Sequence, residues 1–477
     1  MPALRRPVAQ RNPVPALRPR HARGRARPRL PDGEARTVTT PEKLPSGFLG
    51  INAKSIHAAR TPNTDKVSRA KAKGRLHDLL RVSQSVIYDP AAAKEAQHRT
   101  CWCQRALTSP GETLGVRRNV DGSGASLAGV STCGSVWACP VCSLKVCMQR
   151  QAEVADGMKA HVGNGGYVWL MTNTFPHEAG ERPLADMLAL QAKAMQKFQN
   201  CRTYKRILGK GVRAGSIKAL EITLGSHGWH PHTHSLVFAT PDAFGDVKEG
   251  DTGRMASRLI DELKRAWYEA LLKVGLCEPS QLSDVLDHGL DVRGGQYAAE
   301  YVAKFGRDTK WGLSRELTMN AAKTGGGQKG AHPFQLLEWA AAGDGQAAAQ
   351  FREYVAAFTG RRMLTWTPGL KAALGLDELE QSDEEAAAAQ LPEEEVVGAI
   401  SAEDLSVLTA RSMLGRFLAF VSEYCYDPAT AQADIDDFMA FAREHERRAS
   451  GAISAPYWSA RTRKFYDPER ETHEQHQ

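Results

Sequence analysis

The 477-residue sequence has no run of 18 consecutive apolar residues, so it predicts no transmembrane helix. Arg5 and Arg6 stand near the N-terminus, but no apolar segment of the kind found in secretory signals follows them. An amphipathic presequence is disfavoured by the many prolines of the same region. No internal repeat is present. These absences argue against membrane-spanning and secreted proteins, and we expect a cytoplasmic protein without a membrane partner.

Residues 1–45 also lack apolar periodicity, and they carry much of the positive charge. The chain has 62 Lys and Arg against 54 Asp and Glu, a net charge of +8, and six of the arginines lie between Arg18 and Arg29 among prolines. Such a segment cannot bury enough apolar surface to offset the entropy of ordering, so we predict a disordered basic arm. The arm either attracts polyanions such as nucleic acid or is a solvated tail without a specific partner.

Hydrophobic periodicity divides the rest of the chain into segments with different patterns. Strands are predicted near residues 167–174, 217–224, 232–239 and 285–292, and helices near 184–199, 255–275 and 334–376. This mixture predicts an α+β catalytic domain. The expected organisation is a basic arm (1–45), a connector (46–100), a Cys-rich zinc-binding module (101–150), the catalytic domain (151–330), a helical extension (331–380), and an acidic linker with a helical tail (381–477).

Two histidines of the predicted strand 232–239 form a candidate metal site. His232 and His234 are two residues apart, so their side chains point to the same face. If the preceding hairpin turns at Ser226–His227, Glu221 lies opposite His232, because residues equidistant from the turn pair. One carboxylate and two imidazoles suit Mg²⁺ or Mn²⁺ with open coordination positions. The alternatives are histidines that pack without metal and a structural zinc site.

His230 precedes Pro231, and proline interrupts the alternation of a strand at its start. We therefore place His230 outside the predicted ligand set.

A predicted helix after Gly294-Gly295 carries a candidate nucleophile. Tyr301 and Lys304 are three residues apart, and Tyr297 lies four residues before Tyr301, so all three can share one side of the helix. A phenol with a pKa of about 10 needs a neighbouring cation to stabilise its ionised form, and Lys304 is placed to supply it. The alternative is an ordinary amphipathic helix with tyrosine in the core.

Six of the nine cysteines lie between Cys101 and Cys147, which in a reducing compartment indicates metal rather than disulfides. Cys139 and Cys142 have the spacing of a zinc knuckle. The predicted zinc ligands, with Cys101 or Cys147 as substitutes, are Cys103, Cys133, Cys139 and Cys142. The alternative is a group of free buried cysteines. Trp102 and Trp137 either stack on nucleic-acid bases or are buried.

Three motifs in this order resemble those of rolling-circle replication initiators of the HUH endonuclease superfamily, especially plasmid Rep proteins of actinobacteria. The matching segments are Leu170-Met171-Thr172-Asn173-Thr174-Phe175-Pro176-His177, Trp229-His230-Pro231-His232-Thr233-His234 and Tyr301-Val302-Ala303-Lys304. Further similarity lies at Thr132 to Cys142 and at His332 to Leu337, so the resemblance covers roughly residues 100–380.

The resemblance implies an HUH endonuclease palm, a five-stranded antiparallel sheet flanked by helices with the histidine strand near its centre. A Cys-rich zinc module and a helical C-terminal extension would accompany it. The implied activity is sequence-specific nicking and rejoining of one strand of plasmid origin DNA. Tyr301 would form a 5′-phosphotyrosyl bond, and the freed 3′-hydroxyl would prime synthesis. Host helicase and DNA polymerase are the expected partners.

Two positions depart from the family pattern. Thr233 stands where the family has a bulky apolar residue between the histidines. Tyr297 stands where some plasmid initiators have a glutamate that ends the cycle, which suggests termination by a second tyrosine. Glu300 lies roughly 100° away on a helix and is a poor substitute.

Other functions remain open at this point. An HUH transposase can share the motif order and a cysteine module. A zinc-dependent DNA-binding regulator without catalysis is a further alternative. Conjugative relaxases place the tyrosine before the histidines, so the order in this chain argues against them.

Overall fold

The computed structural model describes residues 64–109, 113–122, 124–304, 331–376, 382–388, 394–444, 457–459 and 464–466. The predicted basic arm at residues 1–45 lies outside the described residues. The predicted connector at 46–100 is described from residue 64 onward and consists mainly of helix α2 (Thr64–Ile87).

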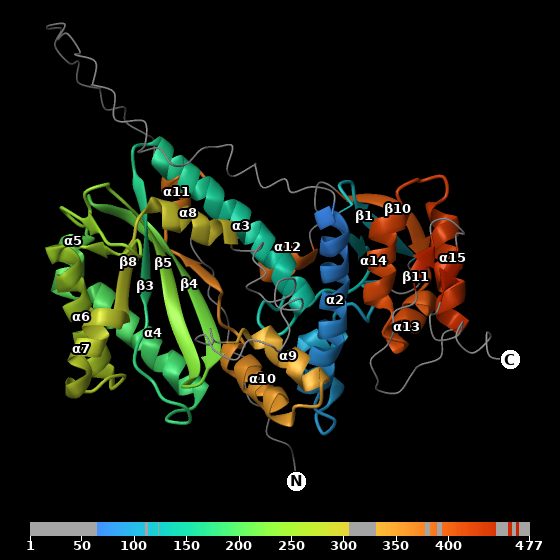
Figure 1. The fold of residues 1–477 in the computed structure, drawn as a ribbon, viewed down its shortest axis with the longest axis horizontal. Coiled ribbons are helices and arrows are strands. Elements are labelled where there is room, and N and C mark those ends of the chain that lie inside the picture. The colour runs from blue at the N-terminus through green and yellow to red at the C-terminus, as the bar shows by residue number, and fades with distance from the viewer. Residues whose placement is uncertain are drawn as a thin grey trace, which may run out of the picture. The chain divides into compact units, whose positions relative to one another are not determined.

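The largest sheet among the described residues is five-stranded and antiparallel, and it is called the central sheet below (Figure 1). Its strands lie in the order β8-β3-β5-β4-β9, so the histidine strand β5 is in the middle. Helices flank this sheet, and the predicted α+β class is confirmed. The bounds are β3 (Tyr167–Asn173), β4 (Arg213–Gly225), β5 (Gly228–Ala239), β8 (Leu290–Arg293) and β9 (Leu364–Trp366).

The edge strands differ from the sequence expectation. Residues 285–292 were expected to be one strand, but they form the π-helix η4 (Val285–Gly289) and the short strand β8. Val285 is buried in the same cluster as Trp267, and a helical turn directs it there. Residues 334–376 were expected to be helical, but β9 interrupts them. Leu364, Thr365 and Trp366 instead pair with β4, because an unpaired sheet edge rewards added main-chain hydrogen bonds.

Different helices cover the two faces of the sheet. α3 (Pro140–Gly163), α8 (Gly295–Lys304) and α11 (Leu370–Ala373) pack on the face that includes Leu236 and Phe238. α4 (Leu184–Asn200) and α6 (Arg258–Val274) pack on the opposite face, against Val237 and Ala239. Ser257 caps the start of α6, and Gly275 ends it with φ of 73° in the left-handed region.

A second core lies around the cysteines and joins them to helices that follow the predicted catalytic domain. It combines residues of α2, the start of α3, α9 (Pro333–Ala341) and α10 (Gly345–Phe358). Trp137 is buried there, with its ring 4.6 Å from that of Phe358, and its Nε1 donates a hydrogen bond to the Arg361 carbonyl. The predicted helical extension therefore shares its core with the predicted cysteine module.

The C-terminal helices form a third core with a small sheet. β1 (Leu114–Asn119) pairs with β10 (Glu394–Ile400) and with β2 (Ala125–Leu127). This sheet packs with α13 (Ala402–Ala410), α14 (Leu414–Tyr424) and α15 (Ala431–Glu444), so the predicted helical tail is present. Because β1 and β2 come from the segment predicted as cysteine module, that module and the tail are structurally connected.

The remaining elements are shorter. They are η1 (Lys94–Ala96), η2 (Arg99–Trp102), α5 (Arg202–Ile207), β6 (Lys248–Glu249), β7 (Met255–Ala256), η3 (Pro279–Gln281), α7 (Leu282–Asp284), α12 (Asp383–Ala388), β11 (Tyr457–Ser459) and β12 (Lys464–Tyr466).

No single helix of the described part of the chain is long and apolar enough to cross a membrane. Helices α13 and α14 have that composition only when taken together, and a bend of 114° separates them.

Candidate active site and metal centres

The β4–β5 hairpin brings Glu221 and the histidines together. Gly225 pairs with Gly228, so the turn contains only Ser226 and His227, as the sequence predicts. Gly228 has φ of +83°, and a Cβ there would lie 3.0 Å from Ala179 Cα, which explains the glycine. Counting back from this turn, Glu221 pairs directly with His232. Paired residues share a face, and His234 joins them because strand side chains alternate.

The three side chains form a compact cluster. The Nε2 atoms of His232 and His234 each lie 3.4 Å from Glu221 Oε2. One ligand atom from each residue lies within 4.8 Å of those of the other two. Burial raises the pKa of the Glu221 carboxyl, but His234 and His232 outweigh it and hold that pKa well below its usual range. The carboxylate is therefore ionised and suited to bind a cation.

Hydrogen bonds orient both imidazoles with Nε2 toward the carboxylate. His234 Nδ1 is 2.8 Å from Thr172 Oγ1 on β3, and His232 Nδ1 donates to the His230 carbonyl at 3.1 Å. Partners on the second ring nitrogen are the usual way in which proteins fix metal-binding histidines. The donor set of two Nε2 atoms and one carboxylate fits a divalent cation with open positions.

Tyr301 completes the cluster from helix α8. Its hydroxyl donates a hydrogen bond of 2.5 Å to Glu221 Oε1, and its ring centroid is 4.8 Å from that of His234. Burial, and then the Glu221 carboxylate, raise the pKa of Tyr301 well above its usual value. The phenol is therefore protonated, and ionising it requires a nearby positive charge.

Two hydrogen bonds hold α8 in place beside the sheet. The Gly295 N–H donates to the Tyr167 hydroxyl at 2.7 Å, and Gln151 Nε2 donates to the Val302 carbonyl at 3.0 Å. Ala298 and Val302, four residues apart, are buried against the sheet. Lys304 is the last residue of α8, but its side chain lies outside the described residues, so its predicted role stays a prediction.

Tyr297 lies one helical turn before Tyr301, but its described contacts are different. The Arg293 guanidinium lies 5.1 Å from the centroid of its ring. The hydroxyl is next to Gly253, where an added Cβ would lie only 2.0 Å from it. The hydrogen bond that ties Tyr301 to Glu221 has no counterpart among the interactions described for Tyr297.

Further histidines surround the cluster, and none of them was predicted as a ligand. β5 continues through Pro231, which pairs with Ile222 of β4. The described pairs between β3 and β5 end at Thr233, so the missing N–H of the proline costs no hydrogen bond to β3. The expected interruption of the strand at Pro231 was therefore wrong. His230 thus lies on the cluster face, with Nε2 3.2 Å from Thr174 Oγ1 and Nδ1 3.5 Å from His177 Nδ1. Burial, and then His232 and His177, lower the pKa of His230 to about 4.

His332 caps the N-terminus of α9, where its Nδ1 accepts a hydrogen bond from the Phe334 N–H at 3.1 Å. Burial lowers the pKa of His332 to about 3, and the nearby Glu221 opposes that shift. Neither His332 nor Thr172 was predicted as a site residue. Thr172 can be recognised as a site residue from its pairing with His234. That pairing depends on how β3 and β5 align in the folded sheet.

The four predicted zinc ligands converge in a second cluster. Cys103, Cys133, Cys139 and Cys142 are all buried and lie close enough to hold one ion. Cys103 Sγ is 3.7 Å from Cys139 Sγ and 3.5 Å from Cys142 Sγ, and Cys133 Sγ is 3.7 Å from Cys142 Sγ. Tetrahedral zinc with bonds of about 2.3 Å places its sulfurs roughly 3.8 Å apart, whereas a disulfide needs about 2 Å. The spacing fits a Cys₄ zinc site.

Main-chain N–H groups donate hydrogen bonds to two sulfur atoms of this Cys₄ cluster. The Cys142 N–H donates to Cys139 Sγ at 3.3 Å, and the Ser135 N–H to Cys133 Sγ at 3.4 Å. The proposed substitute Cys147 instead contacts Met363, with Sγ and Sδ 3.7 Å apart, and burial raises the pKa of its thiol to about 12. Cys101 is buried and is not among the four clustered residues.

A sequence profile described as "Replication protein" matches residues 125–402. The chain belongs to this replication protein family. The match includes Glu221, His232, His234 and Tyr301, and it includes every residue of the Cys₄ cluster except Cys103. The resemblance inferred from the three motifs is thereby confirmed at the level of the family.

Two curated relatives are similar to this replication protein over part of its length. "Protein rep" of Streptomyces lividans is 30% identical over 303 residues, which cover 52% of this chain and 65% of the relative. "Neomycin resistance protein" of Streptomyces cyanogenus is 30% identical over 174 residues, 30% of this chain and 40% of the relative. The matched region thus spans less than two thirds of either relative. No solved structure matches the chain.

Replacing two of the clustered cysteines tests the zinc site. In Cys139→Ser/Cys142→Ser we expect loss of bound zinc and a Tm lower by roughly 10 °C, because a closed zinc site contributes folding free energy directly. Zinc content by mass spectrometry and thermal unfolding measure both effects. The control is Cys101→Ser/Cys147→Ser, which changes two buried cysteines outside the cluster and should keep one zinc per chain. Equal zinc content in both double variants would contradict the assignment.

Proposed function

We propose that this protein initiates rolling-circle replication of a plasmid by nicking and rejoining one DNA strand at the origin. The observation that carries the proposal is the hydrogen bond between the Tyr301 hydroxyl and Glu221, the carboxylate that lies between His232 and His234. A phenol, a cation-binding carboxylate and two imidazoles in one place have the parts needed for phosphodiester transesterification. Membership of the replication protein family supports the same reading.

In the proposed reaction, Tyr301 Oη attacks the phosphorus of the scissile phosphodiester. A phosphorus–oxygen bond to the tyrosine forms, the bond to the 3′-oxygen breaks, and the departing oxygen takes a proton from solvent. Glu221 Oε1 already accepts the hydrogen bond of the phenol, so it is placed to receive the proton that the Tyr301 hydroxyl loses. The 5′-phosphotyrosyl bond retains the energy for rejoining, and the freed 3′-hydroxyl can prime leading-strand synthesis.

Glu221, His232 and His234 would hold Mg²⁺ or Mn²⁺, which supplies Lewis-acid polarisation of the phosphate when bound. The chain positions the donors for it through Thr172 and the His230 carbonyl. Lys304 would add positive charge near the phenolate. Zn²⁺ in the Cys₄ cluster would have a structural role, because all four ligands are buried cysteines and no position is left open.

The proposed substrate is origin DNA, single-stranded or extruded from a supercoiled plasmid, and the proposed partners are a host helicase and DNA polymerase.

Trp137 does not serve as a base-stacking platform, since it is 5% exposed and packs on Tyr354 and Phe358. Trp102 is half-buried, with the Lys94 ammonium 5.3 Å from its ring centroid.

Tyr301→Phe removes the oxygen that would carry the covalent bond and keeps the volume of the ring. We expect nicking of single-stranded origin DNA to fall by more than about 10³-fold, as for loss of other enzymatic nucleophiles, with DNA binding largely retained. The measurement is the covalent 5′ adduct on a denaturing gel. An adduct that persists in Tyr301→Phe and disappears in Tyr297→Phe would move the nucleophile to Tyr297.

Removal of the cation should abolish cleavage without unfolding the protein. Treatment with EDTA should abolish cleavage, and subsequent addition of Mn²⁺ should restore it. The double variant His232→Ala/His234→Ala should stay inactive when Mn²⁺ is added. The matched control is His227→Ala, which changes an exposed histidine in the adjacent turn. Full cleavage by the double variant, or in metal-free buffer, would contradict a metal-assisted mechanism.

Tyr297 is proposed to perform the second cleavage that ends a replication cycle. In that case Tyr297→Phe leaves the first nick nearly unchanged but impairs strand closure and release of single-stranded circles. Both steps are to be measured on one preparation whose zinc content and thermal unfolding match those of the unaltered protein. If Tyr297 only packs against Gly253 and Arg293, both steps should change together or not at all.

A further inference from the structure

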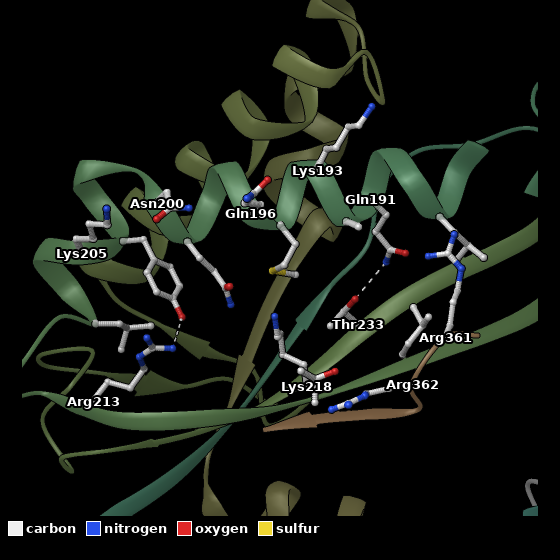
Figure 2. Close-up of a pocket in the computed structure, with 18 of the residues that line it drawn as sticks. Gln191, Lys193, Gln196, Asn200, Lys205, Arg213, Lys218, Thr233, Arg361 and Arg362 are labelled. Atoms are coloured by element: carbon white, nitrogen blue, oxygen red, sulfur yellow. Dashed lines mark hydrogen bonds between the residues drawn. The ribbon is translucent and has the colours of Figure 1, made fainter. Parts of the chain in front are cut away.

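A large groove lies on the face of the central sheet opposite the Glu221–histidine cluster. Its volume is about 1140 Å³, and its walls come from α4, α5, β4, β5, β9 and residues 361–363. Thr233 lies between His232 and His234 in sequence, and its side chain points to the opposite face of the sheet, into the groove. Gln191 Nε2 of α4 donates a hydrogen bond to Thr233 Oγ1 at 3.3 Å (Figure 2).

The groove is strongly cationic. Lys193, Lys205 and Lys210 line it from the helical side, and Arg213 and Lys218 line it from β4. Arg361 and Arg362 complete a set of seven cations, and no aspartate or glutamate is among the described lining residues. Figure 2 shows Arg213, Lys218 and Arg362 along the strands below α4. Several positive charges thus share one space, and none of the described residues around it carries a negative charge.

Burial and a neighbouring cation destabilise the charged form of one lysine in the groove. Burial, and then the nearby Arg213 guanidinium, lower the pKa of the Lys218 ammonium. Arg213 itself is fixed in place, since its Nη1 donates to the Tyr204 hydroxyl at 3.2 Å and its guanidinium lies 5.4 Å from the centroid of the Tyr204 ring. An anion in the groove would relieve the repulsion between these cations.

A lysine and two amide side chains of α4 extend the lining along the helix. Lys193, Gln196 and Asn200 are exposed and recur every three or four residues, so they follow one side of α4 over about 10 Å. Lysine, arginine, glutamine and asparagine are side chains that contact phosphate oxygens in nucleic-acid complexes. A row of such groups suits successive phosphates along one strand better than it suits a single small anion.

The lining favours a duplex over a single strand. Proteins that hold single strands stack bases on exposed aromatic rings. Tyr204 is the aromatic residue in the described lining, and it is buried at 2% exposure with Arg213 against it. Contacts to the phosphate backbone alone leave the bases paired.

We propose that this groove binds the phosphate backbone of duplex DNA on the face of the sheet opposite the nicking site. The inference rests on the proposed function for the identity of the DNA as the duplex that flanks the nicked strand. The two sites are separated by the thickness of one sheet. The protein would thereby hold the flanking duplex on one face and cut the single strand on the other.

The test compares two triple variants that remove the same charge. Lys193→Gln/Lys205→Gln/Lys210→Gln removes three exposed cations from the groove, and Lys159→Gln/Lys248→Gln/Lys273→Gln removes three exposed cations elsewhere. The probes are a 30-base-pair duplex of arbitrary sequence and one of its strands, with binding followed by fluorescence anisotropy at several NaCl concentrations. We expect the groove variant to bind the duplex at least about tenfold more weakly, with a salt slope smaller by about 3. The second triple variant should bind like the unaltered protein.

A measurement without substitutions gives an independent check. In the unaltered protein, the duplex should protect Lys193, Lys205 and Lys210 from acetylation, as read by peptide mass spectrometry, and should leave Lys159 and Lys273 reactive. Equal duplex affinity and salt slope in both triple variants, or no protection of the groove lysines, would overturn the inference. A loss confined to the single strand, or equal on both probes, would overturn the assignment to duplex DNA.

Nicking of a short single-stranded origin by the unaltered protein reports on the proposed function alone, since that substrate has no flanking duplex. Failure to nick would therefore remove the proposed function and leave the duplex-binding result to be judged by itself.

Discussion

The two-residue turn between β4 and β5 fixes the register of the hairpin, and this register decides which side chains meet on each face of the sheet. With Gly225 paired to Gly228, Glu221 lies directly opposite His232. A slip of one residue would move every β5 side chain to the other face, placing Thr233 beside the carboxylate and the imidazoles beside Gln191. Thr172 on β3 and Tyr301 on α8 can contact His234 and Glu221 only because this pairing places those two residues on their side of the sheet.

The central sheet also separates two opposite electrostatic environments. On one face, a carboxylate with a lowered pKa is placed to attract a cation and accepts the hydrogen bond of a phenol. On the other face, seven cations share a groove whose described lining has no carboxylate. Adjacent residues of β5 contribute to both environments, because strand side chains alternate. A sheet of one layer thus separates a cluster built around a carboxylate from a groove lined by cations.

The Cys₄ cluster belongs to a core that also includes Trp229 of the histidine strand β5. Trp137, close to Cys139 in sequence, packs on Tyr354 and Phe358 of α10, and Tyr354 also stacks on Trp229 of β5 with ring centroids 6.0 Å apart. The same core holds α9, whose first turn begins after His332. A chain of packed rings therefore connects the cysteines to the histidine strand. Rigid packing of this kind limits the movement of the groups that it supports.

The sequence alone determined the features that depend on short spacings. The two-residue period of a strand and a two-residue turn predicted the meeting of Glu221, His232 and His234, and the clustering of cysteines predicted the Cys₄ ligands, which the structure brings together. Helices α4 and α6 and the three central strands were also predicted from periodicity.

Only the tertiary structure decided the features that need partners far along the chain. β9 is a strand because it pairs with β4, more than 140 residues earlier, and β1 pairs with β10 across a still longer separation. The sequence named Tyr301 as the candidate nucleophile and placed Tyr297 on the same side of the helix, but it could not say which hydroxyl lies beside Glu221. The docking of α8 on β3 brings Tyr301 to Glu221. The cationic groove likewise collects residues from separate segments. Local propensity acts through neighbours in sequence, whereas these contacts gain their free energy from burial and pairing between distant segments.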